Sequence, residues 1–215
     1  MSSTEKKNAL SRARLYAILD TGYSDPGNWA QLAGQLIRGG AGILQIRAKH
    51  APEKDIVAWT APVLAVTRSA GIPLILNDHP HLVPVTGADG CHIGQEDGTV
   101  AAARKLAGPD ALVGKSTHSL DQARAAEQEA PDYIGFGPIF ATATKPDYVP
   151  IGTEAIQAMA REITLPAFCI GGIKRENAAG LVAMGARRLV IVSGLLQAPD
   201  PEAYAREVLN DLQKL

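Results

Sequence analysis

The chain has 215 residues, enough for one large domain or two small ones, and its formal net charge of −1 gives no overall attraction for nucleic acid or an anionic membrane. Aromatic residues make up 5% of it, which argues against a platform for stacking single-stranded nucleic acid. No apolar run approaches the ~18 residues of a membrane helix. We therefore expect a soluble, cytoplasmic protein that binds small molecules and neither nucleic acid nor membrane, with any phosphate site built locally.

Apolar, β-branched runs alternate with Ala- and Leu-rich stretches of helical period along the chain. Residues 1–12 precede this pattern and are expected to be a frayed tail. Strands are expected near 14–19, 42–47, 73–77, 90–93, 111–115, 132–136, 166–170 and 188–192. Helices are expected near 28–38, 53–70, 79–86, 98–107, 119–129, 153–162, 175–184 and 201–213. Alternation of this kind favours a parallel sheet with helical crossovers.

Eight strand-then-helix units of about 27 residues each indicate a single (β/α)8 TIM barrel as one domain over residues 1–215. The main rival is an open doubly wound sheet, which usually needs a glycine-rich turn after its first strand. The chain reads Asp-Thr-Gly-Tyr-Ser at 20–24, which does not supply that turn. In a barrel the carboxyl ends of all strands share one face, and barrel enzymes carry their chemistry there.

Three polar side chains alternate along the second expected strand. Gln45, Arg47 and Lys49 should all face the barrel lumen, because alternate residues of a strand point the same way. The guanidinium of Arg47 offers a planar fork for phosphate oxygens, and Lys49 offers a point charge. Two alternatives stay open: Lys49 has already left the strand and is solvated, or Gln45 fills a polar layer of the barrel.

Acidic, amide and hydroxyl side chains end the next three strands. Asn77 and Asp78 follow the third strand, Asp97 follows the fourth and Ser116 ends the fifth. Two carboxylates together with substrate phosphate oxygens commonly hold Mg²⁺. The hydroxyl of Ser116 can donate a hydrogen bond to a phosphate. Each of Asp78, Asp97 and Ser116 could instead cap the helix that follows it.

Glycine and hydroxyl residues mark the loops after the last three strands. The loop 137–152 carries two threonines and Lys145, and it either closes over a ligand or is a floppy surface loop. Gly171 and Gly172 follow the seventh strand and Ser193 follows the eighth, where barrels often bind phosphate through backbone N–H groups. This pattern predicts a phosphorylated ligand without identifying it.

Three residues within strands receive a structural interpretation. His92 lies on a short strand and is expected to be a hydrogen-bonded core group. Cys91 and Cys169 lie inside apolar runs and are expected to be reduced, buried thiols.

Seven segments, taken in chain order, resemble the motifs of the thiamine-phosphate synthase family. They read QIRAK, ND, HIGQED, GKSTH, GPIFATATK, GGI and VS, at 45–49, 77–78, 92–97, 114–118, 137–145, 171–173 and 192–193. The resemblance spans nearly the whole chain. It implies a (β/α)8 barrel that joins a pyrimidine diphosphate to a thiazole phosphate, carboxylated or not, and releases diphosphate with Mg²⁺ as cofactor.

The resemblance also assigns roles to individual residues. The pyrimidine diphosphate would be held by Gln45, Ile46, Arg47, Ala48, Lys49, Asn77, Ser116 and Lys145. The thiazole phosphate would be held by Thr142, Ala143, Thr144, Gly172, Val192 and Ser193. Mg²⁺ would be bound by Asp78 and Asp97. Catalysis would depend on Arg47, Lys49, Ser116 and Lys145, of which the three cationic side chains would neutralise charge on the leaving diphosphate.

One position departs from the family pattern. Where the family usually reads Asn-Asp-x-x-Asp, the chain has His81 in place of the second acid, so the metal geometry stays open. Two other functions also stay open. One is a thiazole tautomerase of the same fold, which lacks the complete diphosphate set, and the other is a non-catalytic barrel that binds a phosphorylated ligand. The sequence does not decide whether the chain forms a homo-oligomer.

Overall fold

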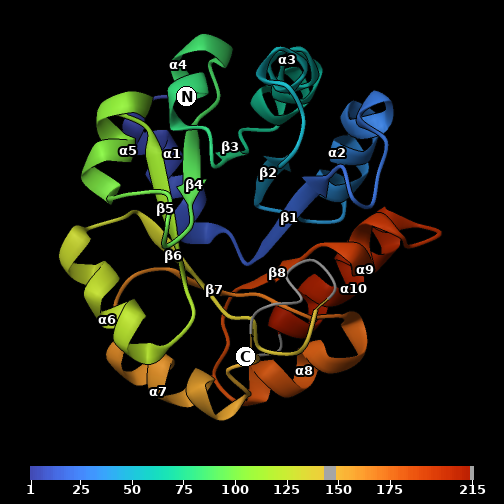
Figure 1. The fold of residues 1–215 in the computed structure, drawn as a ribbon. Coiled ribbons are helices and arrows are strands. Elements are labelled where there is room, and N and C mark those ends of the chain that lie inside the picture. The colour runs from blue at the N-terminus through green and yellow to red at the C-terminus, as the bar shows by residue number, and fades with distance from the viewer. Residues whose placement is uncertain (143–148, 214–215) are drawn as a thin grey trace.

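Eight parallel strands close into a barrel in the computed structural model, which describes residues 1–142 and 149–213 (Figure 1). The strands are β1 (Leu15–Asp20), β2 (Ile43–Arg47), β3 (Leu74–Asn77), β4 (Gly90–Ile93), β5 (Leu112–Thr117), β6 (Tyr133–Phe136), β7 (Ala167–Cys169) and β8 (Leu189–Ile191). Each strand pairs with its neighbour in the sequence, and β8 returns to β1. The predicted (β/α)8 barrel is confirmed.

Helices surround the barrel in Figure 1 and follow the strands closely in sequence. They are α1 (Ser3–Arg12), α2 (Trp29–Arg38), α3 (Glu53–Ser69), α4 (Val83–Thr86), α5 (Val100–Ala107), α6 (Leu120–Glu129), α7 (Glu154–Glu162), α8 (Arg175–Ala183), α9 (Ser193–Leu196) and α10 (Pro201–Gln213), with 3-10 turns η1 (Pro26–Asn28) and η2 (Pro80–Leu82). The helix expected at 79–86 is instead η2 followed by the short α4. Pro80 is the first residue of η2 and Pro84 is the second residue of α4, and proline lacks the N–H that one continuous helix would need there.

The expectation of a frayed tail at 1–12 is wrong, because these residues form helix α1. The side chain of Ser2 accepts from the backbone N–H of Glu5, and the carboxylate of Glu5 accepts from the backbone N–H of Ser2 at 2.6 Å. This reciprocal pattern is a capping box, and Ser-x-x-Glu is its sequence signature. Leu10 packs among the lumen side chains, and Lys6 lies 3.7 Å from the buried carboxylate of Asp89. Helix α1 therefore covers the amino-terminal end of the barrel.

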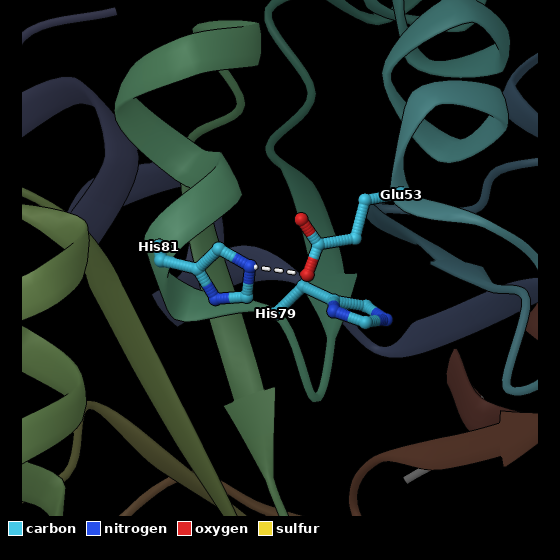
Figure 2. Close-up of side chains that lie close together, drawn as sticks. All are labelled: Glu53, His79 and His81. Atoms are coloured by element: carbon cyan, nitrogen blue, oxygen red, sulfur yellow. Dashed lines mark hydrogen bonds and ion pairs between the residues drawn. The ribbon is translucent and has the colours of Figure 1, made fainter.

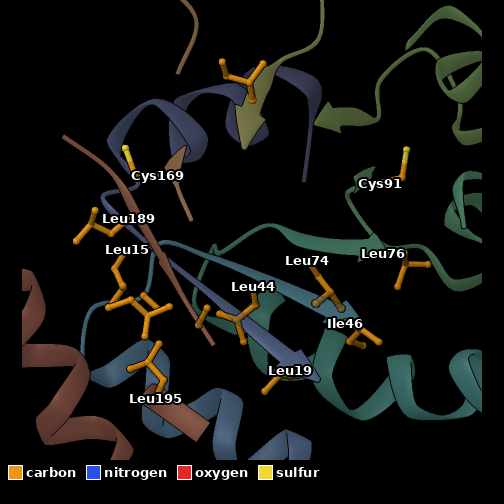
Figure 3. Packing of buried hydrophobic residues seen from close by; sticks show 14 of the residues in the cluster. Leu15, Leu19, Leu44, Ile46, Leu74, Leu76, Cys91, Cys169, Leu189 and Leu195 are labelled. Atoms are coloured by element: carbon orange, nitrogen blue, oxygen red, sulfur yellow. The ribbon is translucent and has the colours of Figure 1, made fainter. Parts of the chain in front are cut away.

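Alternation along the strands divides the buried residues into two layers. On β2, Leu44 and Ile46 point outward and pack against the helices, as Figure 3 shows with their neighbours on β1 and β3. Ile43 and Gln45 point into the lumen instead. Rings of Tyr16, Tyr133 and Phe168 meet edge-on in the lumen, with centroids 5.4 to 5.8 Å apart. The lumen is thus filled in its middle, and space remains at the carboxyl ends of the strands.

Within the described residues, no helix combines the length and the apolar character that crossing a membrane requires. Both cysteines are buried and unpaired with each other, as the sequence predicts.

Candidate active site

A cavity opens at the carboxyl ends of the strands. Eight of the residues predicted to form the site line this cavity: Gln45, Arg47, Asn77, Ser116, Thr142, Gly172, Val192 and Ser193. They come from β2, β3, β5 and the loops after β6, β7 and β8. The fold therefore brings together segments that are nearly 150 residues apart in the chain.

Arg47 is paired with a carboxylate at the end of the neighbouring strand. Its guanidinium lies 2.6 Å from Oδ2 of Asp20, and the two side chains are 15% and 3% exposed. The other oxygen of Asp20 accepts from the backbone N–H of Gly22 at 2.8 Å. Asp20 and Arg47 are direct partners in the parallel register of β1 and β2. The ion pair fixes the position of the guanidinium, and Arg47 forms part of the cavity lining.

A chain of hydrogen bonds crosses the floor of the cavity. The side-chain amide of Gln45 donates to the hydroxyl of Tyr16 at 2.7 Å, and this hydroxyl lies 3.0 Å from that of Tyr133. His92 bonds the Tyr133 hydroxyl through Nδ1 at 3.3 Å and Ser116 Oγ through Nε2 at 2.9 Å. The chain thus links Gln45 on β2 to Ser116 on β5. His92 is hydrogen-bonded, as expected, but it also lines the cavity.

The two tyrosines of this chain stay protonated at ordinary pH. Burial raises the pKa of Tyr16, against the opposing effect of its hydrogen bonds to Tyr133 and Gln45. Burial also raises the pKa of Tyr133 well above its ordinary value, and the nearby Tyr16 adds to the shift. Both hydroxyls therefore act as neutral hydrogen-bonding groups that fix the orientation of Gln45 and His92.

The loops after β6 and β7 pack too tightly to accept side chains at two glycines. Backbone N–H groups of Ile139 and Phe140 donate to the carbonyls of Ile170 and Gly171 at 2.8 and 3.0 Å. A Cβ on Gly171 would lie 2.3 Å from Pro138, and one on Gly172 would lie 2.6 Å from the Ala141 carbonyl. Both glycines also have positive φ, at 100° and 62°, which L residues seldom adopt. This close contact holds Thr142 and Gly172 against the same cavity.

Three residues predicted on β2 do not reach the cavity with their side chains. Ile46 and Ala48 belong to the core between barrel and helices, so they point away from it. Lys49 is exposed and lies two residues beyond the end of the strand at Arg47. The expectation that Lys49 faces the lumen in line with Gln45 and Arg47 is wrong, because strand alternation stops where the strand stops.

The helix-cap alternative fails for Asp97 and Ser116. The side chain of Thr99 caps α5 and that of Ser119 caps α6. Asp78 lies before η2, whose first flanking residue is His79 with no side-chain cap. Asp97 does not cap α5, because Thr99 does so, and Ser116 does not cap α6, because it lies within β5 and Ser119 is the cap.

Asp78 directly follows β3, and Asp97 lies four residues after the end of the neighbouring strand β4. Neither residue belongs to the cavity lining. The backbone of Asp78 has a φ of 60°, and its N–H donates to the carbonyl of His92 at 2.9 Å. Asp97 is exposed, and its Oδ2 accepts from the N–H of Gly94 at 2.7 Å. Left-handed backbone at a non-glycine residue stores strain and is common at functional sites.

Two further points concern the set of site residues. Ala143, Thr144 and Lys145 lie outside the described residues.

Asp20, Tyr16 and Tyr133 line the cavity but were not predicted. Asp20 could have been predicted as a site residue from the sequence, since it is an acidic residue at the end of an apolar strand. The two tyrosines could not have been predicted, because the sequence does not distinguish a buried tyrosine at a site from one in the core.

Comparison with known proteins identifies the family. The model of the family described as thiamine monophosphate synthase matches residues 15–195. Thiamine-phosphate synthase of Chloroflexus aurantiacus is 40% identical over 196 residues, covering 91% of this chain and 90% of that protein. The enzyme of that name from Chlorobium luteolum is 41% identical over 174 residues, covering 80% and 82%.

A solved structure agrees with these relatives. Thiamine phosphate pyrophosphorylase from Pyrococcus furiosus has a TM-score of 0.86 at 26% identity, with 98% of both chains covered. The family match includes the strands and loops that line the cavity, from β1 to α9. The chain therefore belongs to the thiamine monophosphate synthase family and is a transferase of the thiamine-phosphate diphosphorylase type.

Proposed function

We propose that this enzyme joins an aminopyrimidine carrying a diphosphooxymethyl group to a thiazole phosphate, giving thiamine phosphate and diphosphate. The observation that carries this proposal is the shared cavity. Arg47, Asn77 and Ser116 lie on one side of it, and Gly172 and Ser193 lie on the other. The strands β3 and β7 stand opposite each other in a closed barrel of eight, so the two groups suit two substrates that meet between them.

The first group would bind the pyrimidine diphosphate. Arg47 presents a guanidinium for the diphosphate oxygens, and Ser116 presents a hydroxyl oriented by His92. Gln45 and Asn77 offer amides from β2 and β3. The resemblance adds Lys49 and Lys145 as further cations. Charge that develops on the leaving diphosphate would be stabilised by these groups more strongly in the transition state than in the bound substrate.

The second group would bind the thiazole phosphate. Backbone N–H groups around Gly172 can approach a phosphate closely, because glycine places no side chain in the way. Val192 and Ser193 line the cavity from the end of β8, and the Ser193 hydroxyl is a suitable donor. Thr142 extends this side from the loop after β6. This phosphate keeps its charge during the reaction, so these contacts would serve binding rather than the chemical step.

The chemistry needs no protein base. As the carbon–oxygen bond breaks, the aminopyrimidine ring can stabilise the methylene cation, and the thiazole nitrogen attacks with its own lone pair. The side chains of Ile18, Phe168 and Val190 line the cavity and would keep water from the cation. A dissociative route of this kind agrees with the neutral, hydrogen-bonded network on the cavity floor, where Tyr16 and Tyr133 keep their protons.

Asp78 and Asp97 are the residues that we propose to hold Mg²⁺. Their carboxylate oxygens are the donor type that Mg²⁺ prefers, and they lie after neighbouring strands. Asp97 does not cap the helix that follows it, which Thr99 caps. When bound there with substrate, the ion supplies positive charge to the diphosphate. Asp78→Ala and Asp97→Ala should each remove most Mg²⁺-dependent turnover and leave the melting temperature close to that of the wild type. Normal activity and Mg²⁺ dependence in either variant would exclude that residue.

The experiment that tests the proposal is a steady-state assay of folded protein with both substrates and Mg²⁺, in which thiamine phosphate and diphosphate are quantified. Equal amounts of both products are expected. No product above background would refute the proposal. Isomerisation of the thiazole without the pyrimidine would indicate a tautomerase. Binding of a phosphorylated ligand without release of diphosphate would indicate a non-catalytic barrel.

A further inference from the structure

Two imidazoles and one carboxylate gather at the carboxyl side of β3, outside the cavity lining (Figure 2). Glu53 is the first residue of α3, and His79 and His81 flank Pro80 where η2 begins. Figure 2 shows the carboxylate of Glu53 between the two rings. His81 Nε2 lies 2.8 Å from Glu53 Oε1, and the ring centroids of His79 and His81 are 5.7 Å apart.

The separations suit a single ion. One nitrogen or oxygen atom from each of the three side chains lies within 4.8 Å of the others. Ligands around tetrahedral zinc at about 2.0–2.1 Å are separated by roughly 3.3 Å. The widest pair therefore has to close by no more than about 1.5 Å, while the ligand atoms of Glu53 and His81 are already within 3.3 Å of each other. Their side chains are 58% and 44% exposed, so rotation is not restricted by packing.

The backbone that carries these side chains is well anchored. Leu82, in the same turn as His81, is buried, and so is Ile56 in the first turn of α3. Pro80 restricts the backbone between the two histidines. The ligand-bearing positions are therefore fixed by secondary structure, and only the exposed ends of the side chains have to adjust.

We propose that Glu53, His79 and His81 form a site for one zinc-like divalent cation. Two imidazoles and one carboxylate are the ligand set of many zinc sites that keep a fourth position for water. Nitrogen ligands favour Zn²⁺, Co²⁺ or Ni²⁺ over Mg²⁺, which takes oxygen ligands. In the part of the chain that the structure describes, no other three His, Cys, Asp or Glu side chains have ligand atoms this close. The site does not depend on the proposed reaction.

The test is a titration of the full chain with Zn²⁺ alone, without substrates, in competition with a chromophoric chelator. One Zn²⁺ per chain is expected, and a large excess of Mg²⁺ should not displace it. Co²⁺ should give the visible absorption of a tetrahedral complex. His79→Gln, His81→Gln and Glu53→Gln should each weaken Zn²⁺ binding by at least the roughly 10-fold that loss of a supporting partner costs.

His50→Gln is the matched control, because His50 is an exposed histidine in the nearby loop after β2 and does not belong to the cluster. It should bind Zn²⁺ like the wild type, and circular dichroism should show all four variants folded. The proposal is overturned if the wild type binds no Zn²⁺, if the cluster variants bind it as tightly as the wild type, or if Mg²⁺ displaces it.

Discussion

Replacing Arg47 with alanine should destabilise the fold as well as impair the reaction. The guanidinium is the partner of Asp20 at 2.6 Å, and the Asp20 side chain is 3% exposed. Removing one member of a buried ion pair leaves a buried charge uncompensated, which costs about 3–5 kcal/mol. Arg47 is itself 15% exposed, so water can partly replace it and the lower end, about 3 kcal/mol, is expected. Urea unfolding followed by circular dichroism measures this loss.

A double-mutant cycle separates the pair from its two members. Asp20→Asn removes the charge and keeps an oxygen that can accept from the backbone N–H of Gly22. In the double variant Asp20→Asn/Arg47→Ala no unpaired charge remains, so most of the stability should return. We expect a coupling free energy on the order of 2–3 kcal/mol. If Arg47→Ala unfolds at the urea concentration of the wild type, or if the two single effects simply add, the argument for a structural ion pair fails.

The same variants test the role of Arg47 in binding. The double variant should be folded yet keep a low kcat, because it lacks the guanidinium that we propose to bind the diphosphate. Asp20→Asn alone removes the carboxylate partner of Arg47. This variant should therefore bind inorganic diphosphate more tightly than the wild type in a calorimetric titration without Mg²⁺. Full activity of the double variant would remove Arg47 from the site.

Three further changes test other parts of the molecule. Tyr133→Phe keeps the ring but removes the hydroxyl between Tyr16 and His92, so urea unfolding should show a loss of about 1–3 kcal/mol; unchanged stability would show that these bonds carry no weight. Ser193→Ala and Gly172→Ala should raise the KM for the thiazole phosphate more than they lower kcat; at Gly172 the alanine would also have to adopt a φ of 62°. A loss confined to kcat would contradict the assignment. Burial raises the pKa of both cysteine thiols to about 12, so neither should react with a thiol reagent at about pH 8 before unfolding, and rapid labelling of the native protein would refute this.

The fold was predictable because its signal repeats along the chain. Every strand of the barrel falls within two residues of its expected bounds, since buried β-branched runs and the polar residues after them mark both ends. Two helices were missed for different reasons. Helix α9 has four residues, too few for a helical period, and α1 is polar apart from its last turn. For α1 the capping-box pattern outweighs composition, since Ser2 and Glu5 start the helix.

The candidate site residues within a strand were predictable, because strand alternation fixes which way their side chains point. Residues just beyond a strand end were less predictable. Gln45 and Arg47 share the lumen face because both lie within β2, whereas Lys49 follows its last residue. One or two residues at a strand end separate a lumen side chain from an exposed one, and sequence patterns do not locate strand ends that closely. The floor of the cavity was not predictable, because no local pattern connects Tyr16 to Tyr133 across 117 positions.

Arg47 also shows why the charge of a site cannot be summed from the sequence alone. Among the described residues that line the cavity, Arg47 is the one permanent cation and Asp20 the one carboxylate, and they pair with each other. A diphosphate would therefore meet a cavity with almost no net charge. Its own charge has to be balanced by cations from beyond that lining, such as the exposed Lys49 or an ion held by Asp78 and Asp97. On the proposed assignment, the role of Asp78 and Asp97 would be to place a divalent ion in direct contact with the diphosphate oxygens, which the paired Arg47 alone cannot neutralise.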